Sequence, residues 1–180
     1  KLVGSGGRVI AFEPEVRNFE ILKWNIDNFG HENTICANLG VSNYTGEATL
    51  YLDPDNPGGH HLHAPVGSEE KQIIRITTID EFIKDKTGKV DFIKIDAQGA
   101  EQAILDGMKN TLEKNRGGLK VIFEFSPRAL DASAGGLDLA LETMESSFSK
   151  FMFFNETNMN LSEITFDEIV ALGKSGLDSE

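Results

Sequence analysis

The sequence has little of several features, and each shortage excludes a class of protein. Cys36 is the single cysteine among 180 residues, so no intrachain disulfide can form, and a reducing, cytoplasmic compartment is expected. Basic residues number 17 against 29 acidic ones, and the net charge of -12 argues against a nucleic-acid partner or an anionic membrane. No apolar run is long enough to cross a bilayer, and neither a signal peptide nor an internal repeat is visible.

The features that are present are those of an ordinary globular protein. The length allows one domain with a proper core, and the hydrophobic fraction of 39% is typical of soluble proteins. The chain begins with Lys1, in a stretch typical of the end of a helix and a turn. We therefore expect residues 1–180 to be a single domain that is truncated at its N-terminus.

The stretch 90–107 combines an apolar strand, a tight turn and a helix. Its first half is a short apolar run, typical of a strand that is buried on both faces of a parallel sheet. The strand ends at Asp96, and a helix with apolar residues at every fourth position follows: Ala100, Ile104, Met108 and Leu112. Ligands of open α/β sheets bind at the carboxyl ends of strands, which makes Asp96 a candidate site residue.

Acidic residues end two other predicted strands. Residues 8–13 end at Glu13, and residues 119–125 carry Glu124 near their end. Because the carboxyl ends of parallel strands meet at one edge of a sheet, we expect Glu13, Asp96 and Glu124 to line that edge. The alternative for each acid is a residue that interacts with the start of the next helix. Asn38 follows a further short strand, residues 34–37, and is either a site residue or an ordinary turn residue.

The region 46–79 has a different pattern. Residues 46–52 and 73–79 alternate and are rich in β-branched residues, which predicts an inserted β-hairpin. The long loop between these strands contains His60, His61 and His63. Adjacent histidines on an extended chain point to opposite faces, so we predict no metal site. We expect residues 56–68 to form a mobile loop near the sheet edge, with a histidine that reaches the substrate; an exposed loop without a role is the alternative.

The remaining pattern predicts helices that cover such a sheet. Pro14 suits the first turn of a helix that ends at Gly30, and Thr78 with Glu81 predicts the start of a short helix. Further elements are predicted as a helix over 137–148, a strand over 150–155, a short helix over 166–172 and a polar tail. The fold class is therefore α/β, with a mainly parallel sheet, helices on both faces and an inserted β-hairpin.

Two motifs and their spacing resemble one known family. The first is AFEP at residues 11–14, followed by Asn18, Leu22 and Asn25; the second is DFIKIDAQGAE at residues 91–101, followed by Leu105 and Gly107. Together they resemble the FkbM-type family of S-adenosylmethionine (SAM)-dependent methyltransferases. The sequence departs from that family at Gln98, where an acid is usual, and it lacks the first strand with its Asp-x-Gly-x-x-x-Gly cofactor loop.

The resemblance implies a Rossmann-like class I methyltransferase fold and SAM as the cofactor. It also implies methyl transfer to a hydroxyl oxygen of a small molecule, of the sugar or polyketide type. In this fold Glu13 would bind the ribose of SAM, and the loop at Asn38 would pass under the adenine. Asp96 would either hold the cofactor amine or serve as the base, and Glu124 would contact the acceptor.

Two further expectations follow from the departures. Because the cofactor loop is absent, we expect residues 1–180 alone to bind SAM weakly or not at all, whereas the full-length protein should bind it. A non-catalytic α/β binding or interaction module of the same fold is the alternative function, since glutamine at position 98 cannot act as a base. Glu101 is expected to pair on its helix or to support the turn. The acceptor and the oligomeric state stay open.

Overall fold

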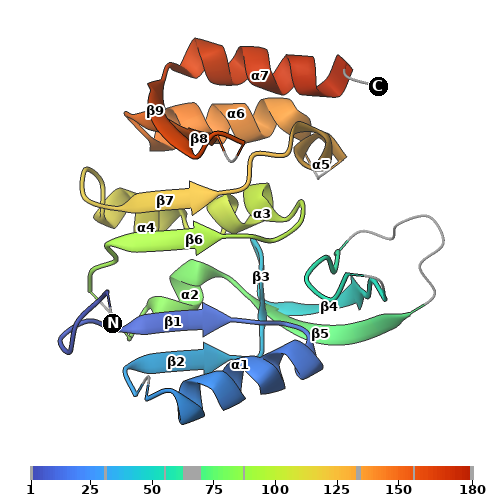
Figure 1. Cartoon of the computed structure of the whole chain (residues 1–180), viewed down its shortest axis with the longest axis vertical. Coiled ribbons are helices and arrows are strands. Elements are labelled where there is room, and N and C mark those ends of the chain that lie inside the picture. Colours follow the sequence, from blue (N-terminus) through green and yellow to red (C-terminus); the bar gives the residue numbers. More distant parts are fainter. Residues whose placement is uncertain are drawn as a thin grey trace. The chain divides into compact units, whose positions relative to one another are not determined.

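The computed structural model describes residues 2–30, 32–54, 56–62, 70–86, 88–132, 135–155 and 157–178. It divides into two compact units, Lys1–Lys86 and Thr87–Glu180, and Figure 1 shows the helices and strands of each. No helix in these described ranges is long and apolar enough to cross a membrane. Each unit contains both helices and strands, which confirms the α/β class; the expected single domain stays a prediction.

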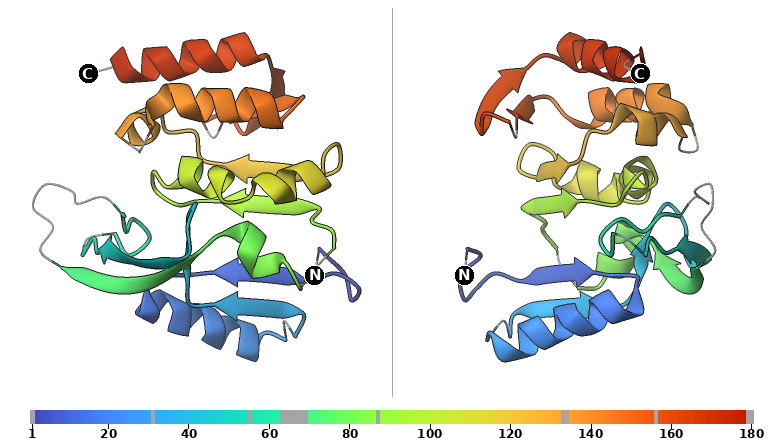
Figure 2. Two further views of the ribbon diagram at one scale, coloured as in Figure 1. Left: turned by 180° about the vertical axis from the view of Figure 1, so that it is seen from behind. Right: turned by 45° about the vertical axis from the view of Figure 1, so that its right-hand side comes forward.

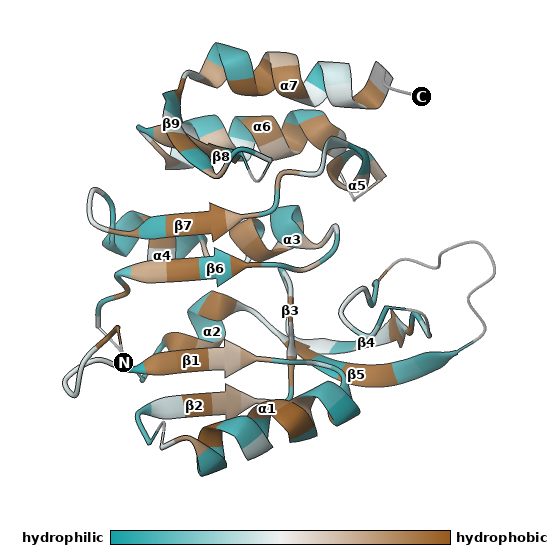
Figure 3. Cartoon of the chain, viewed as in Figure 1, coloured by the Kyte–Doolittle hydropathy of each residue, from teal (hydrophilic) through white to brown (hydrophobic). Residues whose placement is uncertain are grey.

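The first unit begins with a strand–helix–strand segment. Strand β1 (Val9–Phe12) pairs in parallel with β2 (Thr34–Ala37), and helix α1 (Val16–Asn28) connects them. Figures 1 and 2 show α1 running alongside these two strands, and Figure 3 shows both strands as mostly hydrophobic. Gly30 has a φ of 69°, in the left-handed region, and ends the helix as predicted. This segment therefore places Glu13 and Asn38 at the carboxyl ends of neighbouring parallel strands.

The predicted hairpin is confirmed in the first unit. Strand β4 (Gly46–Tyr51) pairs antiparallel with β5 (Lys71–Thr77), and α2 (Ile79–Ile83) follows with Thr78 as its N-cap. The short strand β3 (Gly40–Val41), which the pattern did not predict, pairs in parallel with the other edge of β5. Leu50, Ile74 and Ile76 form the buried cluster beneath this sheet.

The second unit contains the strand, turn and helix that were predicted for residues 90–107. Strand β6 (Phe92–Ile95) pairs in parallel with β7 (Lys120–Phe123), and helices α3 (Glu101–Asp106) and α4 (Lys109–Lys114) connect them. The predicted apolar helix face is buried along its whole length, although the helix is interrupted between α3 and α4. The prediction that β6 is buried on both faces is wrong. Phe92 is 55% exposed, and it shares its face with Lys94, whose ammonium group pairs with Asp96 in solvent.

The rest of the second unit is helical, with a small hairpin. Its elements are α5 (Pro127–Ala132), α6 (Gly136–Ser147), the antiparallel pair β8 (Phe151–Asn155) and β9 (Asn160–Ile164), and α7 (Phe166–Asp178). A buried cluster joins α5, α6 and α7: Leu130, Leu137, Ala140, Leu141, Met144 and Ile169. Helix α6 and strand β8 were predicted, whereas α5 and β9 were not.

Helix α7 is longer than the predicted helix over 166–172. Its glycines explain the difference, because they permit close packing where the sequence suggested a polar tail. A Cβ atom on Gly173 would stand 3.1 Å from Leu137 Cδ2, and one on Gly176 would stand 2.8 Å from Pro127 Cγ. Close contact with α5 and α6 therefore holds the end of α7 despite the low helix propensity of glycine.

The strands of the described ranges form small sheets of mixed direction. The pairs β1–β2, β3–β5 and β6–β7 are parallel, and the pairs β4–β5 and β8–β9 are antiparallel. In each parallel pair, the carboxyl ends of both strands lie on the same side. The predicted site at the carboxyl ends requires this arrangement within a unit. One continuous, mainly parallel sheet stays a prediction.

Gln102 provides a test of how the second unit is stabilised. Its side chain is 1% exposed, Nε2 donates to Thr143 Oγ1 at 2.9 Å, and Oε1 has no partner within the described part of the chain. A buried acceptor without a partner costs about 1–3 kcal/mol. We predict that Gln102→Met unfolds at the same or a higher urea concentration, whereas Gln102→Ala leaves a cavity and loses about 2–3 kcal/mol. An equal loss in both variants would show that the bond to Thr143 outweighs the unpaired oxygen.

Candidate functional site

The turn after β1 is held by two glutamates. Glu13 Oε1 accepts a hydrogen bond from the Glu15 N–H at 2.9 Å. Glu15 is 4% exposed and caps α1, because its Oε2 accepts from the Asn18 N–H at 2.7 Å. The helix therefore begins at Val16, and the prediction that Pro14 lies in its first turn is wrong, since the cap is a glutamate that follows the proline.

Asn38 joins the end of β2 to this turn. Its Nδ2 donates to the carbonyl oxygens of Glu13, at 2.9 Å, and Pro14, at 3.1 Å. The side chain is half-buried, and its Oδ1 accepts no hydrogen bond from the described residues. Asn38 thus fixes the backbone from which the Glu13 carboxylate projects.

The Glu13 carboxylate is partly withdrawn from water. Burial raises the pKa of Glu13 above its ordinary value of 4.5, while the hydrogen bond from Glu15 and the nearby His60 act in the opposite direction. Oε2 of Glu13 accepts no hydrogen bond from residues that the structure describes. A half-buried carboxylate with an unused oxygen is suited to accept hydrogen bonds from hydroxyl groups of a ligand.

The described part of the histidine loop lies beside α1. Asn18 Nδ2 donates to the Pro57 carbonyl oxygen at 2.7 Å, and His60 Nδ1 accepts from the Asp53 N–H at 3.1 Å. His61 forms a two-bond backbone bridge with Tyr51, at 2.8 and 3.0 Å. His60 affects the electrostatics of Glu13, whereas His63 and the other residues of positions 63–68 lie outside the described residues. The mobility of this loop stays a prediction.

Asp96 and Glu124 end the neighbouring strands β6 and β7. Asp96 Oδ2 pairs with Lys94 Nζ at 2.7 Å, and this contact lowers the pKa of Asp96 below its ordinary value. Gln98 Nε2 lies 3.5 Å from Asp96 Oδ1 and 3.4 Å from Glu124 Oε2. The structure thus brings Asp96 and Glu124 together around an amide. The sequence analysis did not assign Gln98 this role, although its place two residues after Asp96 was a signal for it.

Glu101 holds the turn between β6 and α3. It is 2% exposed, Oε1 accepts from the Ala97 N–H at 3.0 Å, and Oε2 accepts from the Gly99 N–H at 2.9 Å. The turn needs this support because Gln98, which has a side chain, adopts a φ of 48° beside Gly99 at 95°. Of the two interpretations left open for Glu101, the structure shows turn support.

The strand-end acids fall into two groups, one in each unit. Glu13 and Asn38 belong to the first unit, and Asp96 and Glu124 belong to the second. A common edge for all of these residues stays a prediction. Within the described ranges, no group of three or more histidine, cysteine or acidic side chains could hold a metal ion.

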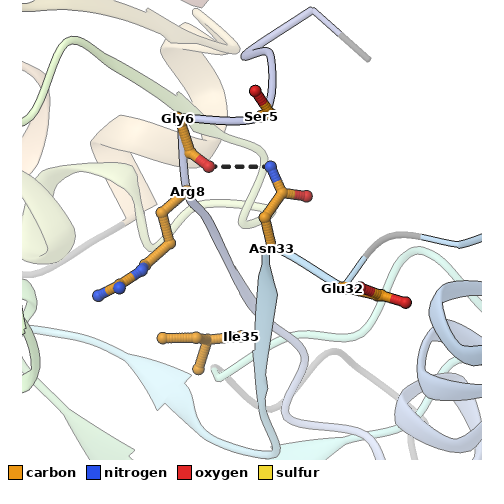
Figure 4. Close-up of a pocket in the computed structure, with 7 residues that line it drawn as sticks. Ser5, Gly6, Arg8, Glu32, Asn33 and Ile35 are labelled. Atoms are coloured by element: carbon orange, nitrogen blue, oxygen red, sulfur yellow. Dashed lines mark hydrogen bonds between the residues drawn. The ribbon is translucent and has the colours of Figure 1, made fainter.

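An open hollow of about 460 Å³ lies at the opposite end of β1 and β2 (Figure 4). Its lining comes from the segments that lead into the two strands, including Arg8, Glu32 and Asn33. Asn33 Nδ2 donates to the Gly7 carbonyl oxygen at 2.8 Å and ties these segments together. Because it lies at the amino ends of the strands, we do not assign it to the ligand site.

Comparison with known proteins identifies the class of protein that has this fold. The structure resembles the crystal structure of methyltransferase FkbM from Methylobacillus flagellatus KT, with a TM-score of 0.52 and 20% sequence identity, over 84% of this chain and 34% of that one. The family model of the methyltransferase FkbM domain matches residues 1–171. The chain therefore belongs to the FkbM methyltransferase family.

The chain is also similar to a methyltransferase with a more specific name. The hexuronic acid methyltransferase AglP of Haloferax volcanii is 29% identical over 106 residues, which are 58% of this chain and 43% of the relative. The chain thus spans less than half the length of both proteins that it matches here.

Glu101 gives a first test of the site. Glutamine at this position offers one oxygen and one N–H donor to two backbone N–H groups, so one of these groups loses its acceptor. We predict that Glu101→Gln lowers the free energy of unfolding by about 1–3 kcal/mol. Amide exchange at Ala97 and Gly99 should also become faster. Unchanged exchange at both amides would contradict the role of Glu101 in the turn.

Glu13 gives a second test, through the pH dependence of stability. Its pKa is raised in the folded state, so the stability that the carboxyl contributes is complete below about pH 4.5, the ordinary value, and is lost as the pH rises through the folded pKa. We predict that Glu13→Gln is more stable than the wild type at pH 7, by no more than about 4 °C in Tm. The difference should vanish at acidic pH.

The control for this measurement is Glu20→Gln, on the exposed side of α1. It should show no comparable gain at pH 7. A lower Tm for Glu13→Gln at pH 7 would contradict the raised pKa of Glu13.

Proposed function

We propose that this chain belongs to a SAM-dependent methyltransferase that transfers a methyl group to a hydroxyl oxygen of a small molecule, of the sugar or polyketide type. We further propose that residues 1–180 form one Rossmann-like class I domain, with a mainly parallel sheet, helices on both faces and the inserted hairpin. The family match supports this, because it extends over both compact units. The name of the Haloferax relative supports a sugar-type acceptor.

The first unit has the residues that suit the nucleoside part of SAM. The half-buried Glu13 carboxylate accepts hydrogen bonds from the two ribose hydroxyls, and its unused Oε2 supports that role. Asn38 keeps the Glu13 backbone in place and lies where the chain passes the adenine. When bound, SAM supplies an activated methyl group on its sulfonium.

The second unit has the residues that suit the reacting end. Asp96 and Glu124 accept hydrogen bonds from the cofactor amine and the acceptor hydroxyl, and they orient the attacking oxygen. Lys94 lowers the pKa of Asp96, so its carboxylate is a weak proton acceptor. We therefore propose that Asp96 orients the reactants and does not remove the proton of the acceptor hydroxyl before methyl transfer. We also propose that one histidine of the loop, among His60, His61 and His63, reaches the substrate.

The observation that carries this proposal is the half-buried Glu13 carboxylate at the end of a parallel strand. NMR spectra of the ¹⁵N-labelled chain during titration with adenosine test it, because they detect even millimolar binding. We predict that adenosine shifts the amide resonances of residues 13–18, and that 2′-deoxyadenosine binds more weakly. Glu13→Gln should weaken adenosine about tenfold, because it removes one charged hydrogen-bonding partner.

Glu20→Gln serves as the matched control and should bind adenosine as the wild type does. An unchanged affinity of Glu13→Gln would remove Glu13 from the site. No response to adenosine, SAM or S-adenosylhomocysteine, either in this chain or in a longer form of the protein, would favour the non-catalytic binding module instead. The cytoplasmic localisation and the absence of nucleic-acid and membrane partners stay predictions from the sequence.

A further inference from the structure

We propose that Asn18 is a positioning residue that ties residues 56–62 to the Glu13 turn and makes this segment one wall of the nucleoside site. The role of this segment in the nucleoside site rests on the proposed function. The attachment of the segment to the Glu13 turn rests on the contacts of Asn18 alone. Asn18 lies at the third position of α1, and Pro57 lies 39 residues further along the chain.

Asn18 is well suited to hold another segment because its own position is fixed. Its backbone N–H donates to Glu15 Oε2, and the Glu15 N–H donates to Glu13 Oε1. Its side-chain Nδ2 then donates to the Pro57 carbonyl oxygen at 2.7 Å. A continuous series of hydrogen bonds thus connects the Glu13 carboxylate to the loop.

The held segment has a defined shape of its own. Asn56 accepts two hydrogen bonds within it, from the Gly59 N–H at 2.8 Å and from the Gly58 N–H at 3.2 Å. Gly59 packs closely against Asn56, because a Cβ atom there would stand 2.5 Å from Asn56 Nδ2 and would displace that side chain. The backbone bridge of His61 to Tyr51 fixes the other end of the segment to β4.

His60 lies between these two attachments. Its Nδ1 accepts from the Asp53 N–H at 3.1 Å, so the proton of the neutral ring resides on Nε2, which is then a donor. Glu13 supplies acceptor oxygens, and His60 is near enough to affect the electrostatics of that carboxylate. A ribose diol both donates and accepts hydrogen bonds, and this pair of side chains matches it.

The experiment compares ¹⁵N spectra of the chain with those of Asn18→Leu, which removes the amide at similar volume, and Asn18→Gln, which keeps it. Asn25→Leu, on the exposed part of the same helix, is the matched control. Without ligand, Asn18→Leu should shift the amides of residues 58–62 and leave Glu15 and Asn38 unchanged, and Asn18→Gln should restore the wild-type positions. If Asn18→Leu does not fold, Asn18→Ala, which keeps the helix cap, replaces it.

Titration with adenosine adds the functional measurement. In the wild type, adenosine should shift residues 13–18 and 58–62 together. In Asn18→Leu it should shift only the first group and bind about three- to tenfold more weakly, as expected for the loss of one hydrogen bond. Asn18→Gln should recover most of this loss, which a general loss of stability would not explain.

Two results would overturn the proposal. Asn18 does not hold the segment if the amide resonances of residues 58–62 keep their wild-type positions in Asn18→Leu without ligand. The segment does not line the nucleoside site if adenosine shifts the amide resonances of residues 13–18 of the wild type but not those of residues 58–62. If adenosine shifts neither group, the proposed nucleoside site itself fails together with the wall, and the ligand-free spectra still decide whether Asn18 holds the segment.

Discussion

A carboxylate that accepts backbone N–H groups fixes the turn after a parallel strand in each unit of this protein. In the first unit, Glu13 accepts from the Glu15 N–H and Glu15 accepts from the Asn18 N–H, at the start of α1. In the second unit, the buried Glu101 accepts from two N–H groups of the turn that precedes α3. N–H groups between the end of a strand and the first turn of a helix have no backbone acceptor in either element. A side-chain oxygen nearby can accept from them instead. The candidate site residues Glu13 and Asp96 are placed by these turns.

The two site carboxylates have opposite electrostatic environments, and this difference suggests different tasks. Burial raises the pKa of Glu13, so its charge is poorly solvated and gains from donors that a ligand brings. Lys94 lowers the pKa of Asp96, so its charge is already compensated. A carboxylate of the first kind lowers folding stability and can regain that free energy by binding hydroxyl groups. A carboxylate of the second kind is an ionised acceptor of constant charge over the neutral range, which suits the orientation of reactants.

Much of the fold could be predicted from local sequence patterns, because those patterns report local physics. The apolar runs that end at Glu13, Asp96 and Glu124 are strands, and the period of four from Ala100 to Leu112 is a buried helix face. The cap at Thr78 and the glycine at position 30 mark helix ends as expected.

The parts that could not be predicted depend on contacts between segments that are distant in the sequence. Helix α7 continues past Gly173 only because α6 and α5 lie close enough to pack against its glycines. Strand β9 consists mainly of exposed residues, and its pairing with β8 defines it. The attachment of Pro57 to Asn18 joins residues that are 39 positions apart, and no local pattern indicates it.

Amide side chains make the long-range connections around both groups of acids, and the charge of the protein explains why. Asn38 donates to the Glu13 turn, Asn18 donates to Pro57, and Gln98 lies between Asp96 and Glu124. In a chain with a net charge of -12, a third carboxylate at position 98 would repel the other two, whereas an amide N–H attracts both. An amide adds no charge and provides a donor, so Gln98 is compatible with a site built from acids. Glutamine at position 98 therefore adds no negative charge to the site and lies next to both Asp96 and Glu124.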